Sequence, residues 1–375
     1  MSTAAATTPT PTPTPPTATS DTLGVIEYEI PTTMKRLVGK EPGKDVASCK
    51  IEVEEIPVPE PEPGEVLVKM VAAPVNPSDY GDWYRSSPDK YPMTMGKEGC
   101  GIVVKVGSSW MTTMSCKVGQ KVGVIGLKKN QGTYSEYVVA KAPIGEIFPL
   151  PHDMEQVQDG ASFFVNPYTT VGILETTRRV HRTNVLVHTA AASQLGQMMV
   201  KLAPSQGMQI INVVRRPEQA EILKEIGAKH IIVTADDTWK DHLKAKIKEL
   251  DCKVAFDAVA GNSTGDMVAA LPTHGTCYVY GGLAGSCGNI SPVDLIYRKK
   301  VVRGWELPNW IQGDGVVAMI WRMRNATATV NAGLSNGGWS STQFMDTTMD
   351  KVHDEIVRLL GSSSTGKKLR IRFDT

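Results

Sequence analysis

Short apolar runs alternate with amphipathic segments through the second half of the chain. Residues 185–187 are continuously aliphatic, and apolar side chains then recur at the spacing of one helix face. These side chains are Leu195, Met198, Met199, Leu202 and Ala203. Similar apolar runs follow at 210–214, 230–233, 254–259, 275–282 and 301–304, separated by predicted helices at 217–226, 236–249 and 264–271. This alternation predicts an α/β fold with a doubly wound parallel sheet.

Residues 22–165 follow a different pattern. Short alternating runs such as 65–71 are separated by turn pairs such as Pro63-Gly64 and Gln131-Gly132, which predicts an all-β, barrel-like domain. Residues 367–373 also alternate, after a predicted helix at 349–360, and we expect this last strand to return to the barrel. The expected domains are therefore a barrel of residues 22–165 plus 325–375 and an inserted sheet domain of residues 166–324.

Residues 1–20 are almost entirely Met, Ser, Thr, Ala and Pro, so we expect 1–21 to be a disordered tail. An organelle leader is the alternative, because the segment is poor in acidic residues, although it contains no arginine. It lacks the basic start and apolar run of a secretory signal.

Composition excludes several classes of function. The net charge is +1 with 21% charged residues, which gives no basic field for nucleic acid. The sequence contains no apolar window of about 18 residues, so no membrane span is predicted. The six cysteines form no C-x-x-C pair, which favours a reducing compartment, the cytoplasm or an organelle.

The turn after the first aliphatic run is built from small residues. Residues 189–193 read Thr-Ala-Ala-Ala-Ser, so backbone N–H groups of Ser193, Gln194 and Leu195 can approach a pyrophosphate at the start of the next helix. Of the three glycines in the dinucleotide fingerprint, Gly196 alone is present. The pattern predicts a dinucleotide site.

Arg215 and Arg216 follow the second strand, where an NAD site usually carries an acidic residue. Guanidinium groups bind a 2′-phosphate in fork geometry, which favours NADPH; a pair of solvated surface arginines is the alternative. The later strands end at Ala260-Gly261 and Tyr280-Gly281-Gly282, where ligands of open α/β sheets bind, and we expect these residues to contact the cofactor.

Several motifs carry a family resemblance. They lie at 76–79 (NPSD), 96–101 (GKEGCG), 132–137 (GTYSEY), 165–169 (VNPYT), 293–295 (VDL) and 302–305 (VRGW), followed by Trp310. The chain resembles the medium-chain dehydrogenase/reductase superfamily over nearly all of residues 30–375. Within it, the chain is similar to the zinc-free quinone reductases and mitochondrial-type enoyl-thioester reductases. The resemblance implies a GroES-like β-barrel catalytic domain with an inserted Rossmann domain.

Asn76 and Lys97 stand where the superfamily's zinc enzymes carry a Cys and a His ligand. Neither is a normal zinc ligand, so we expect no metal. Without a metal to stabilise an alkoxide, reduction of an electron-poor C=C bond is favoured. The resemblance implies 2-enoyl thioesters as substrates, with quinones or α,β-unsaturated carbonyls as the close alternative. An NADPH-binding sensor or structural protein without turnover is the alternative of another class.

The resemblance also implies site residues. Tyr84 is the first candidate proton donor, Tyr91 the second, and Tyr80 a third, because the loop is shorter than the family's. Asn76 would orient the nicotinamide ribose or the substrate carbonyl, and Asn166 and Thr169 would approach the nicotinamide. The seven histidines stand singly in the sequence, so none is expected to be a ligand. A homodimer through the edge strand of the nucleotide sheet is expected by analogy.

Overall fold

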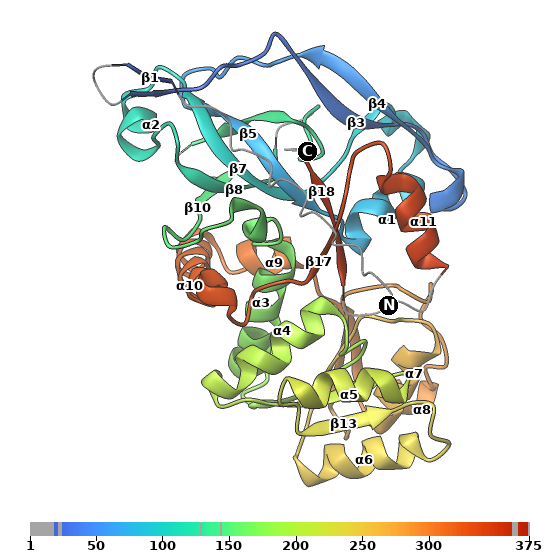
Figure 1. Ribbon diagram of the computed structural model, residues 1–375. Coiled ribbons are helices and arrows are strands. Elements are labelled where there is room, and N and C mark those ends of the chain that lie inside the picture. Colours follow the sequence, from blue (N-terminus) through green and yellow to red (C-terminus); the bar gives the residue numbers. More distant parts are fainter. Residues whose placement is uncertain (1–18, 22–24, 128–129, 143–144, 362–366, 374–375) are drawn as a thin grey trace, which may run out of the picture. The chain divides into compact units, whose positions relative to one another are not determined.

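The computed structural model describes residues 19–21, 25–127, 130–142, 145–361 and 367–373 (Figure 1). The chain divides into two compact units. Unit 1 comprises Met1–Pro149, Asp346–Val357 and Arg370–Thr375, and unit 2 comprises Leu150–Met345 and Arg358–Leu369. No helix in the described ranges is both long and apolar enough to cross a membrane.

Unit 2 contains a six-stranded parallel sheet in the order β13-β12-β11-β14-β15-β16. The strands are β11 (Val185–His188), β12 (Gln209–Val214), β13 (His230–Val233), β14 (Val254–Asp257), β15 (Thr276–Val279) and β16 (Val301–Gly304). The chain runs outward from β11 to one edge and then from β14 to the other. The predicted doubly wound parallel sheet is therefore confirmed.

Eight helices accompany this sheet in the described part of unit 2. They are α3 (Val165–Val180), α4 (Gln194–Leu202), α5 (Pro217–Glu225), α6 (Trp239–Glu249), α7 (Asn262–Ala270), α8 (Pro292–Ile296), α9 (Leu307–Gln312) and α10 (Val316–Leu334). Val185 and Val187 of β11 share one core with α6 and α7. Leu186, pointing the other way, shares a second core with α3 and α4. Burial on both faces explains why the first three residues of β11, 185–187, are all aliphatic.

Unit 1 is mainly β-structure, as the turn-rich pattern predicted. One strand path runs β10-β8-β7-β5-β18-β17, with β9 also pairing with β5, and a second sheet runs β4-β3-β6. The strands are β3 (Thr33–Glu41), β4 (Lys50–Pro57), β5 (Glu65–Pro74), β6 (Met93–Thr94), β7 (Glu98–Val106), β8 (Lys121–Ile125), β9 (Tyr137–Lys141), β10 (Ile147–Pro149), β17 (Phe344–Thr347) and β18 (Lys368–Arg372).

The core of unit 1 is lined by alternate residues of neighbouring strands. Val66, Val68 and Met70 of β5 pack against Val103 of β7 and Val122 of β8. In the described part of this unit, three helices accompany the strands, α1 (Pro77–Arg85), α2 (Trp110–Ser115) and α11 (Val352–Leu360). Arg370 of β18 lies opposite Pro74 of β5, so the last strand returns to the N-terminal unit as expected.

The compact units end at other residues than the sequence suggested. Unit 2 begins at Leu150 rather than 166 and extends to Met345 rather than 324. The later end is explained by α10, which runs across residue 324 and packs against α3 and α9. Arg322 of α10 bonds Glu175 of α3 at 3.2 Å and the Trp310 carbonyl of α9 at 2.6 Å.

The expected disordered tail falls mostly outside the described residues, which omit 1–18. Its last three residues form β1 (Thr19–Asp21), paired antiparallel with β2 (Val25–Glu27). That pairing differs from the expectation for residues 19–21.

Gly196 provides a test of how tightly α4 packs. A Cβ at this position would lie 2.1 Å from the Ala191 carbonyl oxygen. Gly196→Ala should lower the unfolding free energy by about 2 kcal/mol, although alanine normally favours a helix. Gly304→Ala is the control, since its Cβ would meet nothing within 4 Å, and should change stability by less than about 0.5 kcal/mol. Urea unfolding of both variants measures the difference; equal stabilities would contradict the close approach.

Candidate functional site

The turn between β11 and α4 is held close to the helix that follows it. Ser193 caps α4, and its hydroxyl oxygen accepts the N–H of Gly196 at 3.2 Å. The N–H of Ser193 itself donates to the Ala190 carbonyl at 2.9 Å. Ala191 and Ala192, whose side chains are single methyl groups, are buried in this turn. This geometry brings the positive end of a helix to the carboxyl edge of the sheet, although the Ser193 N–H, predicted to face a pyrophosphate, already donates to Ala190.

Arg215 and Arg216 follow β12, the strand next to β11. Arg215 is exposed and Arg216 half-buried. Their backbone N–H groups both donate to the side-chain oxygen of Gln219 in α5, at 3.0 and 3.1 Å. The turn that carries the two guanidinium groups is therefore fixed by a side chain of the next helix.

A buried carboxylate organises the end of β14. Asp257 is fully enclosed and accepts hydrogen bonds from the hydroxyls of Thr189 and Thr264, both at 2.7 Å. It also accepts the Val259 N–H at 3.0 Å and the Ser263 hydroxyl at 3.2 Å. The sequence analysis did not predict a role for Asp257. A charged side chain at the end of the apolar run 254–256 was the signal that could have indicated one. The turn it holds contains Ala260 and Gly261, both with positive φ (61° and 56°).

Tyr280 follows β15 and reaches across β14 to His188 at the end of β11. The His188 Nε2 and Tyr280 Oη atoms lie 2.5 Å apart, and the rings stack with centroids 5.8 Å apart and planes 16° from parallel. Burial lowers the pKa of His188 to about 3, so the imidazole is neutral. In the sequence, His188 stands apart from the other histidines and was not expected to be a ligand. The fold pairs it with Tyr280, a residue predicted to contact the cofactor. Gly281 is required beside it, because a Cβ there would lie 2.6 Å from the Ala258 carbonyl.

The first turn of α3 holds the other two residues expected near the nicotinamide. Asn166 is half-buried, and its carbonyl accepts the Thr170 hydroxyl at 3.0 Å; Thr169 is buried. Two tryptophans pack farther along this helix. A Cβ on Gly172 would lie within 3.0 Å of atoms of both Trp305 and Trp310. These tryptophans therefore pack against α3.

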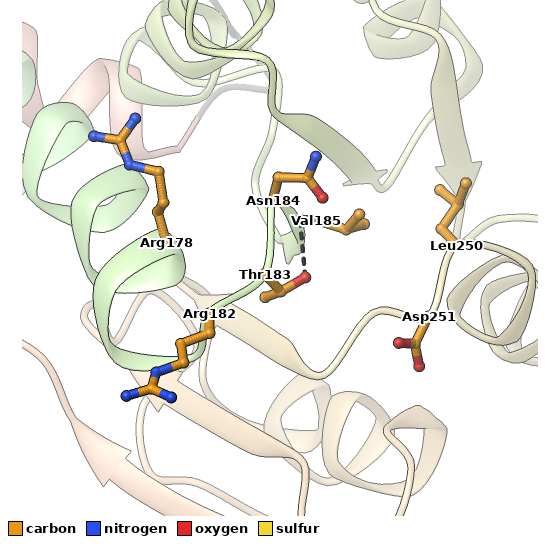
Figure 2. A pocket seen from close by; sticks show the side chains of 7 residues that line it. All are labelled: Arg178, Arg182, Thr183, Asn184, Val185, Leu250 and Asp251. Carbon is orange, nitrogen blue, oxygen red and sulfur yellow. Dashed lines mark hydrogen bonds between the residues drawn. The ribbon is translucent and has the colours of Figure 1, made fainter.

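An open pocket of about 510 Å³ lies at the opposite, amino edge of the sheet. It is lined by Arg178, Arg182, Thr183, Asn184, Val185, Leu250 and Asp251 (Figure 2). Figure 2 shows the Arg178 and Arg182 side chains extending in opposite directions, so they do not converge on one anion. Helices α3 and α6 also end here, and the negative ends of their dipoles disfavour anions. This pocket is therefore separate from the candidate dinucleotide site.

Unit 1 contains a buried polar cluster around the start of α1. The Asn76 side-chain amide donates to Glu98 at 3.0 Å, and the Asn76 N–H donates to Asp79 at 2.7 Å. All three side chains are buried. Lys97, next to Glu98, instead points to the surface, where it pairs with Asp82 at 2.8 Å and donates to the Ser78 carbonyl at 2.9 Å.

The residues at the superfamily's zinc positions do not fit a zinc ion. The Asn76 amide is a donor bound to a carboxylate, and the Lys97 ammonium is engaged in an ion pair. Across the described ranges, no group of three or more His, Cys, Asp or Glu side chains is arranged to hold a metal ion.

The three candidate tyrosines lie in or near α1 and differ in burial and in the hydrogen bonds of their hydroxyl groups. The Tyr91 hydroxyl donates to the Trp83 carbonyl at 2.5 Å, so its proton already has an acceptor. Burial raises the pKa of Tyr80 to about 12. Tyr84 is half-buried, with the Arg85 guanidinium 5.1 Å from its ring centre, and its hydroxyl has no hydrogen bond to any described residue. Of the three candidates, Tyr91 is therefore the one whose hydroxyl already donates to a backbone carbonyl, and Tyr84 remains a predicted donor.

Asp79 provides a pH test of the buried cluster. Burial raises its pKa to about 6 from 3.8, against the opposing effects of the Asn76 N–H and the Lys97 charge. A carboxyl whose folded pKa is raised stabilises the fold below pH 4 and loses that contribution as the pH rises through about 6. Asp79→Asn should therefore raise the unfolding free energy at pH 7 by up to about 3 kcal/mol, with the gain vanishing near pH 4.

Urea unfolding at both pH values measures this gain. The control is Asp82→Asn, on the same helix but with its carboxylate half-exposed, which should change stability by less than about 1 kcal/mol at either pH. A gain in Asp79→Asn that is the same at pH 4 and pH 7 would refute the raised pKa.

Two protein-family models match this chain, one mainly in unit 1 and one in unit 2. The family model described as "Alcohol dehydrogenase GroES-like domain" matches residues 62–152, and the one described as "Zinc-binding dehydrogenase" matches residues 195–321. The mitochondrial enoyl-[acyl-carrier-protein] reductase of Bos taurus is 31% identical over 65% of this chain and 65% of its own length. That of Arabidopsis thaliana is 29% identical over 76% of this chain and 71% of its own. The match thus spans slightly less than two thirds of the bovine relative.

Solved structures share the fold over nearly the whole chain. A putative NADPH:quinone reductase from Mesorhizobium loti superimposes with a TM-score of 0.77 and 27% identity, covering 92% of this chain and 100% of that one. Escherichia coli quinone oxidoreductase complexed with NADPH gives a TM-score of 0.74 at 18% identity, covering 89% and 99%. With both family models matched and this fold shared, the chain belongs to the medium-chain dehydrogenase/reductase superfamily, in the branch of its quinone reductases and enoyl-thioester reductases.

Proposed function

We propose that this protein is an NADPH-dependent, metal-free reductase of an activated C=C bond, with 2-enoyl thioesters as its main substrate class. The observation that carries the proposal is the Asn76–Glu98 pair, which puts an amide–carboxylate hydrogen bond where a zinc enzyme needs a metal ligand. The relatives named as enoyl-[acyl-carrier-protein] reductases support the substrate class.

The carboxyl edge of the unit 2 sheet would hold NADPH. Arg215 and Arg216 bind the 2′-phosphate, and the first turn of α4, from Ser193 to Gly196, faces the pyrophosphate. The nicotinamide half lies toward Asn166 and Thr169 of α3 and the strand ends at 260–261 and 280–282. The close contact between Gly196 and Ala191 supports this arrangement, because it keeps the phosphate turn free of side-chain bulk. Bound there, NADPH supplies the hydride that reduces the double bond.

The protein's own contribution to the chemistry is to stabilise negative charge on the substrate. Hydride addition at the β-carbon of an enoyl thioester leaves an enolate, which hydrogen-bond donors stabilise before a proton reaches the α-carbon. Tyr84 is the proposed donor, because a phenol hydroxyl can donate a hydrogen bond and this one has no other partner among the described residues. Asn76 is held by Glu98 and Asp79 and orients the substrate carbonyl or the ribose.

Quinones or α,β-unsaturated carbonyls are the second candidate substrates. The 27% identity with the Mesorhizobium loti putative quinone reductase over that protein's whole length favours them. Both candidates need the same hydride donor and the same stabilisation of negative charge on oxygen. Their substrates differ in the thioester and the long acyl chain.

The partner we propose besides the small-molecule substrate is a second copy of this chain. Strand β16 is the last strand of its sheet in the described part of unit 2, and it pairs there with β15. Ile296 and Tyr297, just before it, are 64% and 76% exposed, and an apolar surface next to a sheet edge suits a homodimer. All six cysteines are free, which suits a reducing compartment, the cytoplasm or an organelle.

The arginine pair provides a test of coenzyme choice. Arg215→Ala combined with Arg216→Ala should weaken NADPH binding by about tenfold to a hundredfold, because charge-assisted hydrogen bonds to the 2′-phosphate are lost. NADH binding should change by less than about twofold, since NADH lacks that phosphate. Isothermal titration measures both constants. Arg178→Ala combined with Arg182→Ala, at the amino edge, should change neither, and tighter NADH than NADPH binding by the native protein would refute the assignment.

Turnover tests the reaction and the donor together. NADPH consumption should be fastest with crotonyl-CoA when compared with an enone and a small quinone. Tyr84→Phe should lower kcat by about a hundredfold, because general acid catalysis contributes about that much. Tyr91→Phe is the control, since that hydroxyl is bound to a backbone carbonyl, and it should lower stability more than rate.

An unchanged kcat in Tyr84→Phe would remove Tyr84 as the donor. Faster turnover of the quinone would favour the second substrate class. NADPH binding without any turnover would instead favour a sensor or structural protein.

A further inference from the structure

The His188 imidazole has one nitrogen with a partner and one without. Nε2 lies 2.5 Å from the Tyr280 hydroxyl, while Nδ1 is buried and has no hydrogen bond in the described part of the chain. An unpartnered buried polar atom is costly and rare in folded proteins, so each one needs an explanation. The explanation here depends on which nitrogen carries the proton.

A neutral imidazole carries one N–H, which allows two arrangements of the pair. In the first, Tyr280 donates to Nε2, the proton is on Nδ1, and a buried donor is unsatisfied. In the second, Nε2–H donates to the tyrosine oxygen and the Tyr280 hydroxyl hydrogen is released for another acceptor. The second arrangement becomes favourable when a ligand presents an acceptor to Tyr280, which is partly exposed while His188 is fully enclosed.

The position of Tyr280 indicates which part of a ligand it meets. The arginine pair follows β12, the phosphate turn follows β11, and Tyr280 follows β15, three strands from β12 in the order β12-β11-β14-β15. Three strand spacings amount to about 14 Å. A dinucleotide with its 2′-phosphate at the arginines and its pyrophosphate at α4 therefore brings its nicotinamide end to the β14 and β15 turns.

We propose that Tyr280 donates its hydroxyl hydrogen to the carboxamide oxygen of the nicotinamide, and that His188 is a positioning residue that changes tautomer to permit it. The inference rests on the proposed function, since it requires NADPH at this edge. It adds a side-chain contact for the nicotinamide. It also explains why the buried Nδ1 atom of His188 has no hydrogen-bond partner in the described part of the chain. In the bound state Nδ1 is an acceptor without a proton, and the pair's one N–H is used.

The test compares two ligands that differ in the nicotinamide. Dissociation constants for NADPH and for 2′-phospho-ADP-ribose, which lacks that ring, are measured by isothermal titration on the full chain. Tyr280→Phe keeps the ring and removes the hydroxyl, so it should weaken NADPH binding by about fivefold to tenfold. Binding of 2′-phospho-ADP-ribose should stay within about twofold of the native value.

Tyr278→Phe is the matched control. Tyr278 lies on β15, two residues before Tyr280, and its hydroxyl pairs with another histidine, His181 Nε2, at 3.0 Å. That variant should change neither constant. If Tyr280→Phe weakens both ligands equally, the hydroxyl merely shapes the turn and the inference fails; an unchanged NADPH constant also overturns it. If the native protein binds neither ligand, the proposed function fails first, which is a distinguishable result.

A spectroscopic measurement tests the role of His188 without a mutation. The ¹⁵N chemical shifts of His188 report which ring nitrogen carries the proton. NADPH should move the proton from Nδ1 to Nε2, whereas 2′-phospho-ADP-ribose should leave it on Nδ1. A tautomer that is the same with and without NADPH would overturn the positioning role.

Discussion

The hydrogen bonds at the carboxyl edge of the unit 2 sheet are the constraint on which the candidate cofactor site depends. Parallel strands end in turns whose backbone groups have no partners in the sheet, so something else must fix them. Thr189, one residue beyond β11, and Asp257, the last residue of β14, bond each other at 2.7 Å. His188 and Tyr280 join the ends of β11 and β15 in the same way. These two side-chain pairs hold three turns that come from distant parts of the chain.

The cluster in unit 1 uses polar groups differently. Asn76, Asp79 and Glu98 surround the start of α1 with carboxylates and an amide, and the lysine beside them is directed to the surface. In a zinc enzyme of this superfamily, a metal ion would offset the buried negative charge. Here the offset comes from hydrogen bonds and from the raised pKa of Asp79. The substitution of two ligands therefore changes both the chemistry available and the electrostatics of the fold.

Membership of the superfamily fixes the architecture more firmly than it fixes the substrate. Enoyl thioester and quinone reduction need the same hydride donor and the same stabilisation of negative charge on oxygen, so the roles proposed for Tyr84 and Arg215 would serve either reaction. Substrate choice depends on contacts with the acyl chain or the ring. The candidate tyrosines show that neighbouring residues of the same type can differ in the contacts they make. The Tyr91 hydroxyl donates to a backbone carbonyl, whereas the hydroxyl of Tyr84, seven residues earlier, does not.

The sequence by itself determined the α/β fold, the parallel sheet, the returning C-terminal strand and the small-residue turn after β11, because these follow from local periodicity and small residues. It also predicts a 2′-phosphate site at Arg215 and Arg216 and shows the altered zinc positions, because these are single positions within recognisable motifs. The tertiary structure decided what depends on distant partners. The Arg322–Glu175 contact places α10 in unit 2, and His188 and Tyr280, far apart in the chain, become neighbours. Pairings of that kind leave no periodic signal, since strand order and burial create them.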